Sequence, residues 1–280
     1  MLAGSTEELY QAVFDTPSPV AFITGSVANR VGRHIAAHFQ SAGFRIVVHS
    51  HSHPAPQKGA TSGGSGRVTA SVGGQDVLHL SGGIEDEKQV AAWCDAVLNE
   101  HGRCDVLVQS AAIWNPKPLE QTEQADFARS MNVNAIGPAL GCKIFGLAMA
   151  HQSSGGTIIN IGDWAVRRPY RDFAAYMASK GAIKTVTESM AVELALRNPR
   201  MRVNCILPGP VMIDERVGAE RREQIRQECL LKRQGSADDV AHAALFLATS
   251  PFVTGVSLPV DGGRSIYAGP SHDSIAHPEV

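Results

Sequence analysis

Short apolar segments alternate along the chain with longer segments of helical periodicity, and this order constrains the fold more than any single motif. The expected strands are residues 20–23, 45–49, 77–80, 106–108, 157–161, 202–206 and 257–260. Helical patterns fall between most of them, over residues 87–100, 125–150, 174–196 and 237–248. Strands that alternate with helices form a parallel sheet. The sequence therefore predicts a single α/β domain, a doubly wound parallel sheet of about seven strands with helices on both faces.

The expected domain spans residues 18–265, because no break in composition interrupts it and the 44% hydrophobic content suffices for a sizeable core. Residues 1–17 are expected to be an extension ahead of the first strand, and residues 266–280 an irregular C-terminal tail. Residues 54–74 contain too much Gly and Ser for the helix that would otherwise cross over there. A short helix or a loop is expected in its place.

Charge and cysteine content argue against several functions. The formal net charge of −2 argues against a general nucleic-acid binder. No signal peptide and no apolar run of membrane-spanning length are evident, so no membrane association is expected. The five cysteines form no Cys-x-x-Cys pair and are therefore expected to be reduced thiols in the core. Reduced thiols indicate an intracellular, cytoplasmic setting.

The first expected strand is followed by a glycine-containing turn and then by a helical pattern. The turn reads TGSVANRVG from Thr24 to Gly32. A strand, a glycine turn and a helix together form a phosphate cradle, because glycine lets the backbone approach a pyrophosphate and the helix N–H groups point at it. The sequence therefore predicts a nucleotide cofactor at this turn.

Tyr176 and Lys180 lie four residues apart in a helical pattern, so they share one face of the helix. A cation close to a phenol lowers its pKa, and such a tyrosine can transfer a proton near neutral pH. The same spacing also occurs by chance on amphipathic helices. Asp163, thirteen residues before the tyrosine, follows an expected strand end and is either a cap, a proton-transfer group, or both.

Six elements occur in the order typical of one family. They are the turn from Thr24 to Gly32, the segment from Asp105 to Ala111, Asn134, the pair Tyr176 and Lys180, Pro208-Gly209, and the segment from Val260 to Gly263. With them the chain resembles the short-chain dehydrogenase/reductase family over residues 18–265. The resemblance implies a Rossmann fold, a nicotinamide cofactor and a small-molecule substrate. It implies catalysis by Asp163, Tyr176, Lys180 and Asn134, and a homotetramer or homodimer formed through the helices that contain Asn134 and Tyr176.

Within that family the chain is similar to the pteridine reductase branch. Asp163 stands where most members carry serine, and Arg30 stands in the cofactor turn. The second expected strand ends in HSHSH without an acidic residue, and Trp114 follows the segment GRCDVLV. The similarity implies that Trp114 stacks on a pterin, and an ordinary core position is the alternative. Substrate contacts are implied at Arg30, Trp114, Asp163, Tyr176 and Gly209.

Three departures from the family pattern lie at the cofactor site. The turn is one residue longer than usual between Gly25 and Arg30, and Gln109-Ser110 replaces two asparagines. Ser81 stands where an aspartate often contacts adenine. The departures suggest adapted cofactor contacts and leave the catalytic groups in place.

The absence of an acidic residue after the second strand favours NADP(H), because a carboxylate there would select the ribose 2′-OH of NAD. Arg30 and the histidines of HSHSH could supply charge for a 2′-phosphate. A polar loop and a metal site are the alternatives for this run; no Cys or carboxylate completes a ligand set, so no metal is expected. The implied cofactor contacts are Thr24, Gly25, Asn29, Arg30, Val31, Gly32, His49, Ser50, His51, Ser52, Ser81, Ser110, Ala111, Ile161, Tyr176, Lys180, Pro208, Gly209 and Val211.

Reduction of a C=N bond needs hydride at carbon and a proton at nitrogen, which the implied Asp–Tyr–Lys set and a nicotinamide supply. The sequence thus predicts an NADPH-dependent reductase of a pterin or folate-like substrate. The nearest alternative is a generic carbonyl or alcohol oxidoreductase of the same family. The alternative of another class is a catalytically silent NADP-binding scaffold that regulates a partner. Residues 211–233 are expected to form a mobile substrate lid or a solvated surface helix.

Overall fold

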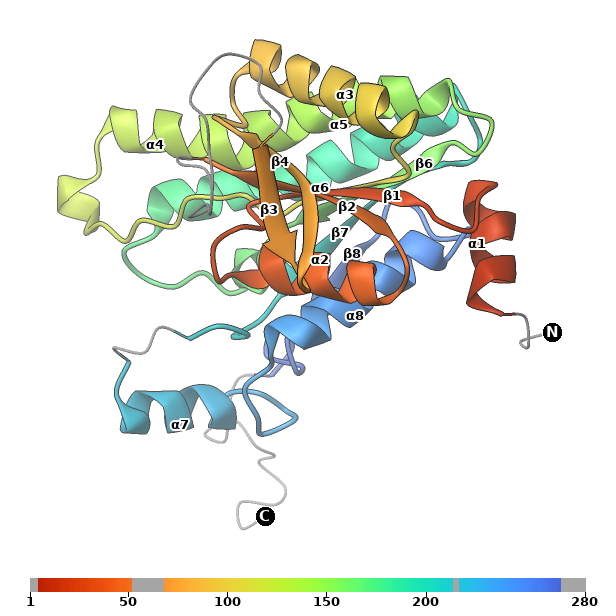
Figure 1. Cartoon of the computed structure of the whole chain (residues 1–280). Coiled ribbons are helices and arrows are strands. Elements are labelled where there is room, and N and C mark those ends of the chain that lie inside the picture. The colour runs from red at the N-terminus through yellow and green to blue at the C-terminus, as the bar shows by residue number, and fades with distance from the viewer. Residues whose placement is uncertain (1–4, 52–67, 214–216, 268–280) are drawn as a thin grey trace.

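The strands of the protein form one twisted sheet. The computed structural model describes residues 5–51, 68–213 and 217–267, and within them eight strands lie in the order β3-β4-β2-β1-β5-β6-β7-β8 (Figure 1). Every neighbouring pair is parallel except β3 and β4. The strands are β1 Val20–Thr24, β2 Arg45–Ser50, β3 Val68–Val72, β4 Gln75–Ser81, β5 Val106–Gln109, β6 Gly156–Ile161, β7 Met201–Pro208 and β8 Ser257–Val260. The predicted α/β Rossmann fold is confirmed, and all seven expected strands are present.

Helices cover both faces of the sheet. One core cluster joins side chains of the sheet to α2 and α8, and a second joins the other face to α3, α5 and α6. This arrangement follows from strands that are buried on both faces, since β1 and β6 are buried at every position. The helices are α1 Thr6–Phe14, α2 Val31–Ser41, α3 Glu87–His101, α4 Gln124–Met131, α5 Gly137–Ala150, α6 Ala174–Ala195, α7 Ala219–Gln227 and α8 Ala237–Thr249.

The hairpin of β3 and β4 corrects the expectation of a short helix or loop over residues 54–74. Strand β3 adds to the sheet antiparallel to β4, and the two are joined at Gly73 and Gly74. Both glycines have positive φ, of 53° and 82°, which a tight two-residue hairpin turn requires. The Gly-Gly pair was therefore a turn signal rather than only a helix breaker. The rest of that segment, up to residue 67, lies outside the described residues.

The N-terminal segment, expected as an extension, contributes to the core through helix α1. Ser5 and Glu8 form a reciprocal capping box at its start. Tyr10 and Phe14 are buried, and the Tyr10 ring meets the Phe44 ring edge-on at 4.9 Å between centroids. Aromatic burial of this kind fixes the helix against the α2 side of the sheet.

One helical stretch is long and apolar enough to cross a membrane by length and composition, contrary to the expectation that none is. It is the continuous run Gln124–Ala150, formed by α4, a π-helical segment Asn132–Ile136 and α5. Half of its most apolar window is buried inside the protein, where α5 packs on α3 and α6. Core helices pass the same test, so the run is explained by burial against the sheet. Association of copies through this helix and α6 stays a prediction.

Candidate active site

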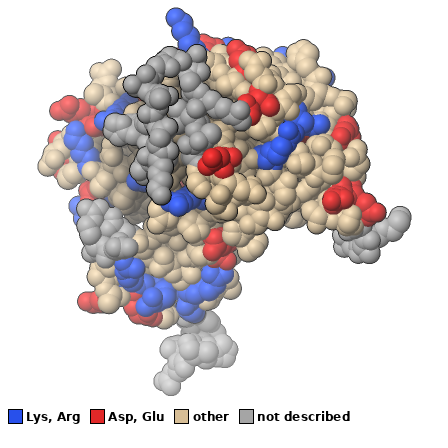
Figure 2. Space-filling view, in the orientation of Figure 1, with Lys and Arg blue, Asp and Glu red and all other residues tan. Residues whose placement is uncertain are grey.

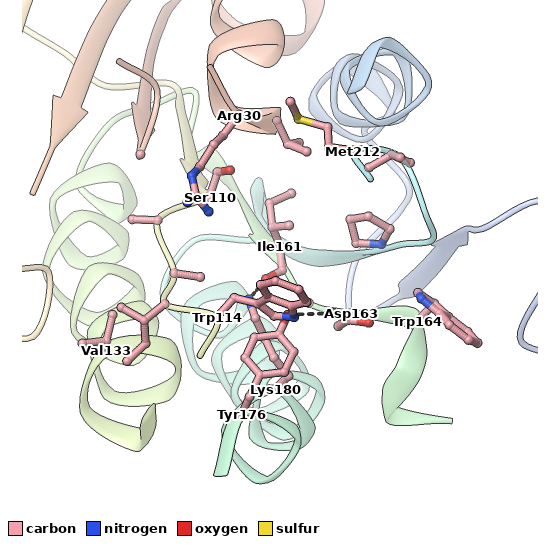
Figure 3. Close-up of a pocket in the computed structure, with 18 of the residues that line it drawn as sticks. Arg30, Ser110, Trp114, Val133, Ile161, Asp163, Trp164, Tyr176, Lys180 and Met212 are labelled. Atoms are coloured by element: carbon pink, nitrogen blue, oxygen red, sulfur yellow. Dashed lines mark hydrogen bonds between the residues drawn. The ribbon is translucent and has the colours of Figure 1, made fainter. Parts of the chain in front are cut away.

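A cleft of about 1850 Å³ opens at the carboxyl ends of the central strands (Figure 3). The sheet order changes direction at β1, with β2 on one side and β5 on the other. Loops that leave β1 and β5 turn to opposite faces, so a crevice remains between them, which is where ligands bind in open α/β sheets. The lining residues come from the turn after β1, the loops after β2, β4, β5, β6 and β7, and helices α4, α6 and α7.

The glycine turn after β1 packs closely against the backbone of the loop after β5. A Cβ on Gly25 would lie 2.8 Å from Ala111 Cα, and one on Gly32 would lie 2.6 Å from the Gly25 oxygen. Thr24 Oγ1 accepts hydrogen bonds from the N–H groups of Ser110 and Ala111, both at 3.1 Å. Thr24 and Gly32 therefore build the turn beneath the cleft. The residues of the turn that line the cleft are Gly25, Ala28, Asn29, Arg30 and Val31. The glycines therefore let the turn pack against the loop after β5, and the N–H groups at the start of α2, directly after the turn, suit a dinucleotide pyrophosphate.

His49 supports this turn as a neutral ring. The Gly25 N–H donates to His49 Nδ1 at 3.2 Å, and His49 Nε2 lies 3.0 Å from the Gly82 carbonyl, which makes Nε2–H the donor. The ring is fully buried and packs on Trp93 at 4.6 Å between centroids. Burial lowers the pKa of His49 to about 4. The expectation that His49 supplies positive charge to a 2′-phosphate is therefore wrong.

The remaining expected cofactor contacts divide into lining and supporting positions. Arg30 is exposed at the start of α2, and its side chain reaches toward Ser110 (Figure 3). Ser81 does not line the cleft; its neighbour Gly82 does. Gln109 is also withdrawn, because its Nε2 donates to the Pro138 carbonyl at 2.8 Å. Ser52 lies outside the described residues. The other expected contacts that line the cleft are His49, Ser50, His51, Ser110, Ala111, Ile161, Tyr176, Lys180, Pro208, Gly209 and Val211.

Asp163, Tyr176 and Lys180 come together at the floor of the cleft. The Tyr176 hydroxyl donates to Asp163 Oδ2 at 2.7 Å (Figure 3). The other carboxylate oxygen accepts the Ala165 N–H at 2.8 Å and so caps the short 3₁₀ helix Trp164–Val166. The capping and proton-transfer interpretations of Asp163 are thus compatible. Lys180 Nζ donates to the Ile161 carbonyl at 2.7 Å, and both its side chain and the Tyr176 ring are buried.

The pKa of Tyr176 differs from the sequence expectation, in which Lys180 lowered that pKa. Burial raises the pKa of Tyr176 far above its usual value, and the charge and hydrogen bond of Asp163 raise it further. Burial also lowers the pKa of Lys180. The lysine was expected to act on the phenol directly, but its ammonium is bound to a backbone carbonyl instead. The arrangement therefore keeps the Tyr176 hydroxyl protonated and hydrogen-bonded to Asp163, and these two side chains can exchange the proton.

Asn134 does not line the cleft. Its amide group pairs with both the N–H and the carbonyl of Ile113, at 2.9 and 3.0 Å. Its Nδ2 also donates to Ser179 Oγ at 3.1 Å, and that hydroxyl donates to the Tyr176 carbonyl at 2.7 Å. In this structure Asn134 is a positioning residue that ties the loop after β5 to the first turns of α6.

An aromatic wall stands beside the catalytic groups. Trp114 is 48% exposed, which excludes the core interpretation, and it stacks on Phe173 at 4.8 Å and 28° between rings. Its Nε1 approaches the Tyr170 hydroxyl at 3.5 Å. Phe173 in turn meets the Tyr176 ring edge-on at 6.1 Å between centroids, and both Trp114 and Tyr176 line the cleft. The indole is therefore partly exposed beside the cleft, and its stacking on a flat ligand stays a prediction.

Sequence reasoning missed several lining residues between Asp163 and Tyr176 and near the C-terminus. They are Trp164, Arg168, Tyr170 and Arg264. The run RRPYR between the two catalytic residues was a readable signal, whereas Arg264 is brought in only by the fold. The region expected to form a lid contains α7, and three residues of this region line the cleft: Arg221, Ile225 and Glu228. Figure 2 shows that Lys and Arg gather at the α7 end of the molecule.

Comparison with known proteins agrees with this fold and site. A family model described as "Enoyl-(Acyl carrier protein) reductase" matches residues 27–265. Glucose 1-dehydrogenase 2 of Bacillus subtilis is 30% identical over 90% of this chain and 97% of its own length. Carbonyl reductase family member 4 of Danio rerio is 32% identical over 84% of this chain and 94% of its own length. The ligand-free aldohexose dehydrogenase structure from Thermoplasma acidophilum superposes with a TM-score of 0.76 at 26% identity, covering 90% of this chain and 95% of that chain.

The chain therefore belongs to the short-chain dehydrogenase/reductase family, and its class is that of the NAD(P)(H)-binding oxidoreductases. The cleft agrees with that membership, because the Tyr176 hydroxyl, the Asp163 carboxylate and the Lys180 ammonium lie in the same cleft as a glycine turn suited to a dinucleotide. The similarity to the pteridine reductase branch is not reflected in these relatives, whose names refer to sugars and carbonyl compounds.

Replacing the buried histidine should flatten the pH dependence of stability. The unfolded chain takes up a proton at His49 below pH 6.5, whereas the folded chain resists until about pH 4. Stability is therefore lost as pH falls through this window, by about 3 kcal/mol when complete. In urea unfolding measured from pH 7 to pH 4, the His49→Gln variant should have a lower free energy of unfolding than the wild type at pH 7. That free energy should also fall less steeply as the pH is lowered. The exposed His151 gives the matched control, His151→Gln; equal slopes for both variants would contradict the assignment.

Replacing the phenol should abolish turnover and spare cofactor binding. Tyr176→Phe removes the hydroxyl that donates to Asp163 and leaves the buried ring. We expect the turnover number to fall by about a hundredfold or more, with nicotinamide cofactor affinity, measured by fluorescence titration, nearly unchanged. Tyr10→Phe removes a phenol hydroxyl outside the cleft and serves as the control. Near-normal turnover in Tyr176→Phe would remove the tyrosine from the mechanism.

Proposed function

We propose that the protein is an NADPH-dependent reductase whose first candidate substrate is a pterin or folate-like compound. The observation that carries this proposal is the 2.7 Å hydrogen bond from Tyr176 to Asp163 in the cleft that the partly exposed Trp114 also lines. A hydroxyl at the Asp163 position could only share a proton with a substrate oxygen. A carboxyl can also deliver one, which the reduction of a C=N bond requires at nitrogen.

The residues of this chain would perform the proton-transfer half of the reaction. Tyr176 would release its proton to the substrate atom beside it. The Asp163 carboxylate, after taking up a proton from solvent, is within hydrogen-bonding distance to return one to the phenolate. Lys180 holds the Ile161 carbonyl at the edge of the cleft and places a cation near Asp163. The glycine turn and the other cofactor-lining residues would hold a nicotinamide dinucleotide, whose chemistry when bound would be hydride transfer to carbon. Trp114 would hold a flat ring in register by stacking, worth about 1 kcal/mol beyond burial.

The generic alternative, a carbonyl or alcohol oxidoreductase, is supported by the names of the relatives. In that case Asp163 would act mainly through its hydrogen bond to Tyr176 and its cap on the following turn. The silent scaffold is disfavoured by the intact and buried Tyr176 and Lys180.

The NADP preference of the proposal is supported by Arg30 and by the sequence that ends β2. The residues from His49 to His53 include no carboxylate that could claim a ribose 2′-OH. Because His49 is neutral and buried, Arg30 is the arginine that lines this end of the cleft among the described residues.

The cofactor preference should therefore depend on Arg30. We expect wild-type kcat/KM to be higher with NADPH than with NADH, and Arg30→Ala to lose about tenfold or more with NADPH, since a charge-assisted contact to phosphate is lost. The NADH value should change little. Arg33→Ala, an exposed arginine on the same helix that does not line the cleft, is the matched control. A wild-type preference for NADH would exclude the proposed 2′-phosphate site.

Replacing the carboxylate separates the two substrate classes. If Asp163 helps to protonate a ring nitrogen, Asp163→Ser should lose about a hundredfold in kcat/KM on a dihydropterin, because an alcohol is a far weaker acid. If the substrate is a ketone, serine restores the hydrogen-bond donor usual in the family, and activity should survive or rise. The measurement is kcat/KM of both proteins on dihydrobiopterin and on a simple ketone. Full dihydropterin activity in the serine variant would rule out the preferred mechanism.

A further inference from the structure

We propose that the substrate of this site carries a carboxylate, and that Arg168 binds it. The inference deepens the proposed reductase function and rests on it only for the identity of the reacting group. It comes from the distribution of charge at the end of the cleft opposite the cofactor turn, where one arginine has no acidic partner among the described residues.

The charges that line the cleft are unequal. Five arginines line it, Arg30, Arg129, Arg168, Arg221 and Arg264, against the acidic residues Glu85, Asp163 and Glu228. Arg221 and Arg264 both pair with Glu228: the Arg221 Nη1 lies 3.1 Å from Oε1, and Arg264 Nη2 contacts Oε2. Among the described residues, a single carboxylate thus serves two guanidinium groups at this end of the cleft.

Arg168 is held in place without being neutralised. Its Nη1 donates to the backbone carbonyls of Arg264, at 3.0 Å, and of Tyr267. Within residues 5–51, 68–213 and 217–267, no carboxylate lies within ion-pair distance of it, and its Nε and Nη2 donate no hydrogen bond. The side chain is half-buried, so the unpaired charge is partly desolvated. One nitrogen anchors the planar group, and the edge formed by Nε and Nη2 has the geometry that binds a carboxylate through two parallel bonds.

The arginine lies at the substrate end of the cleft. Arg168 is bound to the backbone of Arg264, whose guanidinium lies 4.7 Å over the ring of Trp164, the residue after Asp163. Burial is the largest cause of the raised pKa of Tyr170. The charge of Asp163 raises this pKa further and that of Arg264 lowers it, so Tyr170 is within electrostatic range of both residues. Figure 3 places Trp164 on the far side of Asp163 from Arg30 and Ser110. A ligand bound at Tyr176 and Trp114 would therefore extend an acidic substituent toward Arg168, away from the cofactor.

A purely structural role is the competing explanation, because Arg168 also ties down the segment from Arg264 to Tyr267. The two roles predict different results. An anchor would alter stability and affect all substrates alike, whereas a carboxylate-binding group changes the preference between an acid and its neutral analogue.

The test compares 4-carboxybenzaldehyde with methyl 4-formylbenzoate as substrates, and benzoate with benzamide as non-reacting ligands in calorimetry. In the wild type we expect the acid to be preferred over the ester and benzoate to bind more tightly than benzamide. Arg168→Gln should lower the acid-to-ester ratio of kcat/KM, and the benzoate affinity, by about 10- to 100-fold. Arg168→Lys should recover only part, because an ammonium lacks the fork.

Arg167→Gln is the matched control, since Arg167 is the adjacent arginine, is exposed and does not line the cleft. It should keep the wild-type ratio. Thermal unfolding of each variant identifies a loss of fold. An acid-to-ester ratio unchanged in Arg168→Gln, or benzoate binding unchanged in it, overturns the inference. Failure of the wild type to reduce any aldehyde or dihydropterin counts against the proposed function instead, while Arg168-dependent benzoate binding would still support the carboxylate site.

Discussion

The close packing of the β1 turn against the loop after β5 determines where everything else in the site lies. Gly25 meets Ala111 at a distance that leaves no room for a side chain, and Thr24 fixes the loop by accepting two of its N–H groups. The crevice between the two connections is a consequence of sheet order, because the chain leaves β1 and β5 toward opposite faces. Catalytic groups reach this crevice from the turn after β6 and from α6, a helix that packs on β6 and β7. The site is therefore preorganised by backbone contacts rather than by mobile side chains.

Burial, rather than the mere proximity of charges, governs the ionisation of the site. His49, Tyr176 and Lys180 all have pKa values shifted toward the neutral form, and desolvation is the largest cause for each. Asp163 adds a negative charge that holds the phenolic proton more firmly. A nearby cation would have the opposite effect, which is why spacing along a helix alone gave the wrong sign for the tyrosine. The phenol of Tyr176 is thus kept protonated in the ligand-free cleft.

The sequence contained most of the fold and part of the site. Continuous apolar strands and intervening helical patterns determined the sheet, and the motif order located Asp163, Tyr176 and Lys180. The β3 hairpin was missed because its Gly-Gly turn was taken as a helix breaker, and the packing role of Tyr10 and Phe14 depends on a distant partner, Phe44. The neutral state of His49 could not be read either, because it follows from tertiary burial. Contacts between residues far apart in sequence, such as those of Arg168 with Arg264, exist only once the chain is folded.

The contacts of Arg264 connect three parts of the chain that are far apart in the sequence. Its guanidinium lies over Trp164, donates to the Ile225 carbonyl and pairs with Glu228, while its own carbonyl accepts from Arg168. The covering helix α7, the catalytic turn and the last described segment therefore cannot move independently. Thermodynamic reciprocity then applies: a ligand that steadies the turn also steadies the C-terminal segment, and any event that draws that segment away weakens the ligand by the same factor.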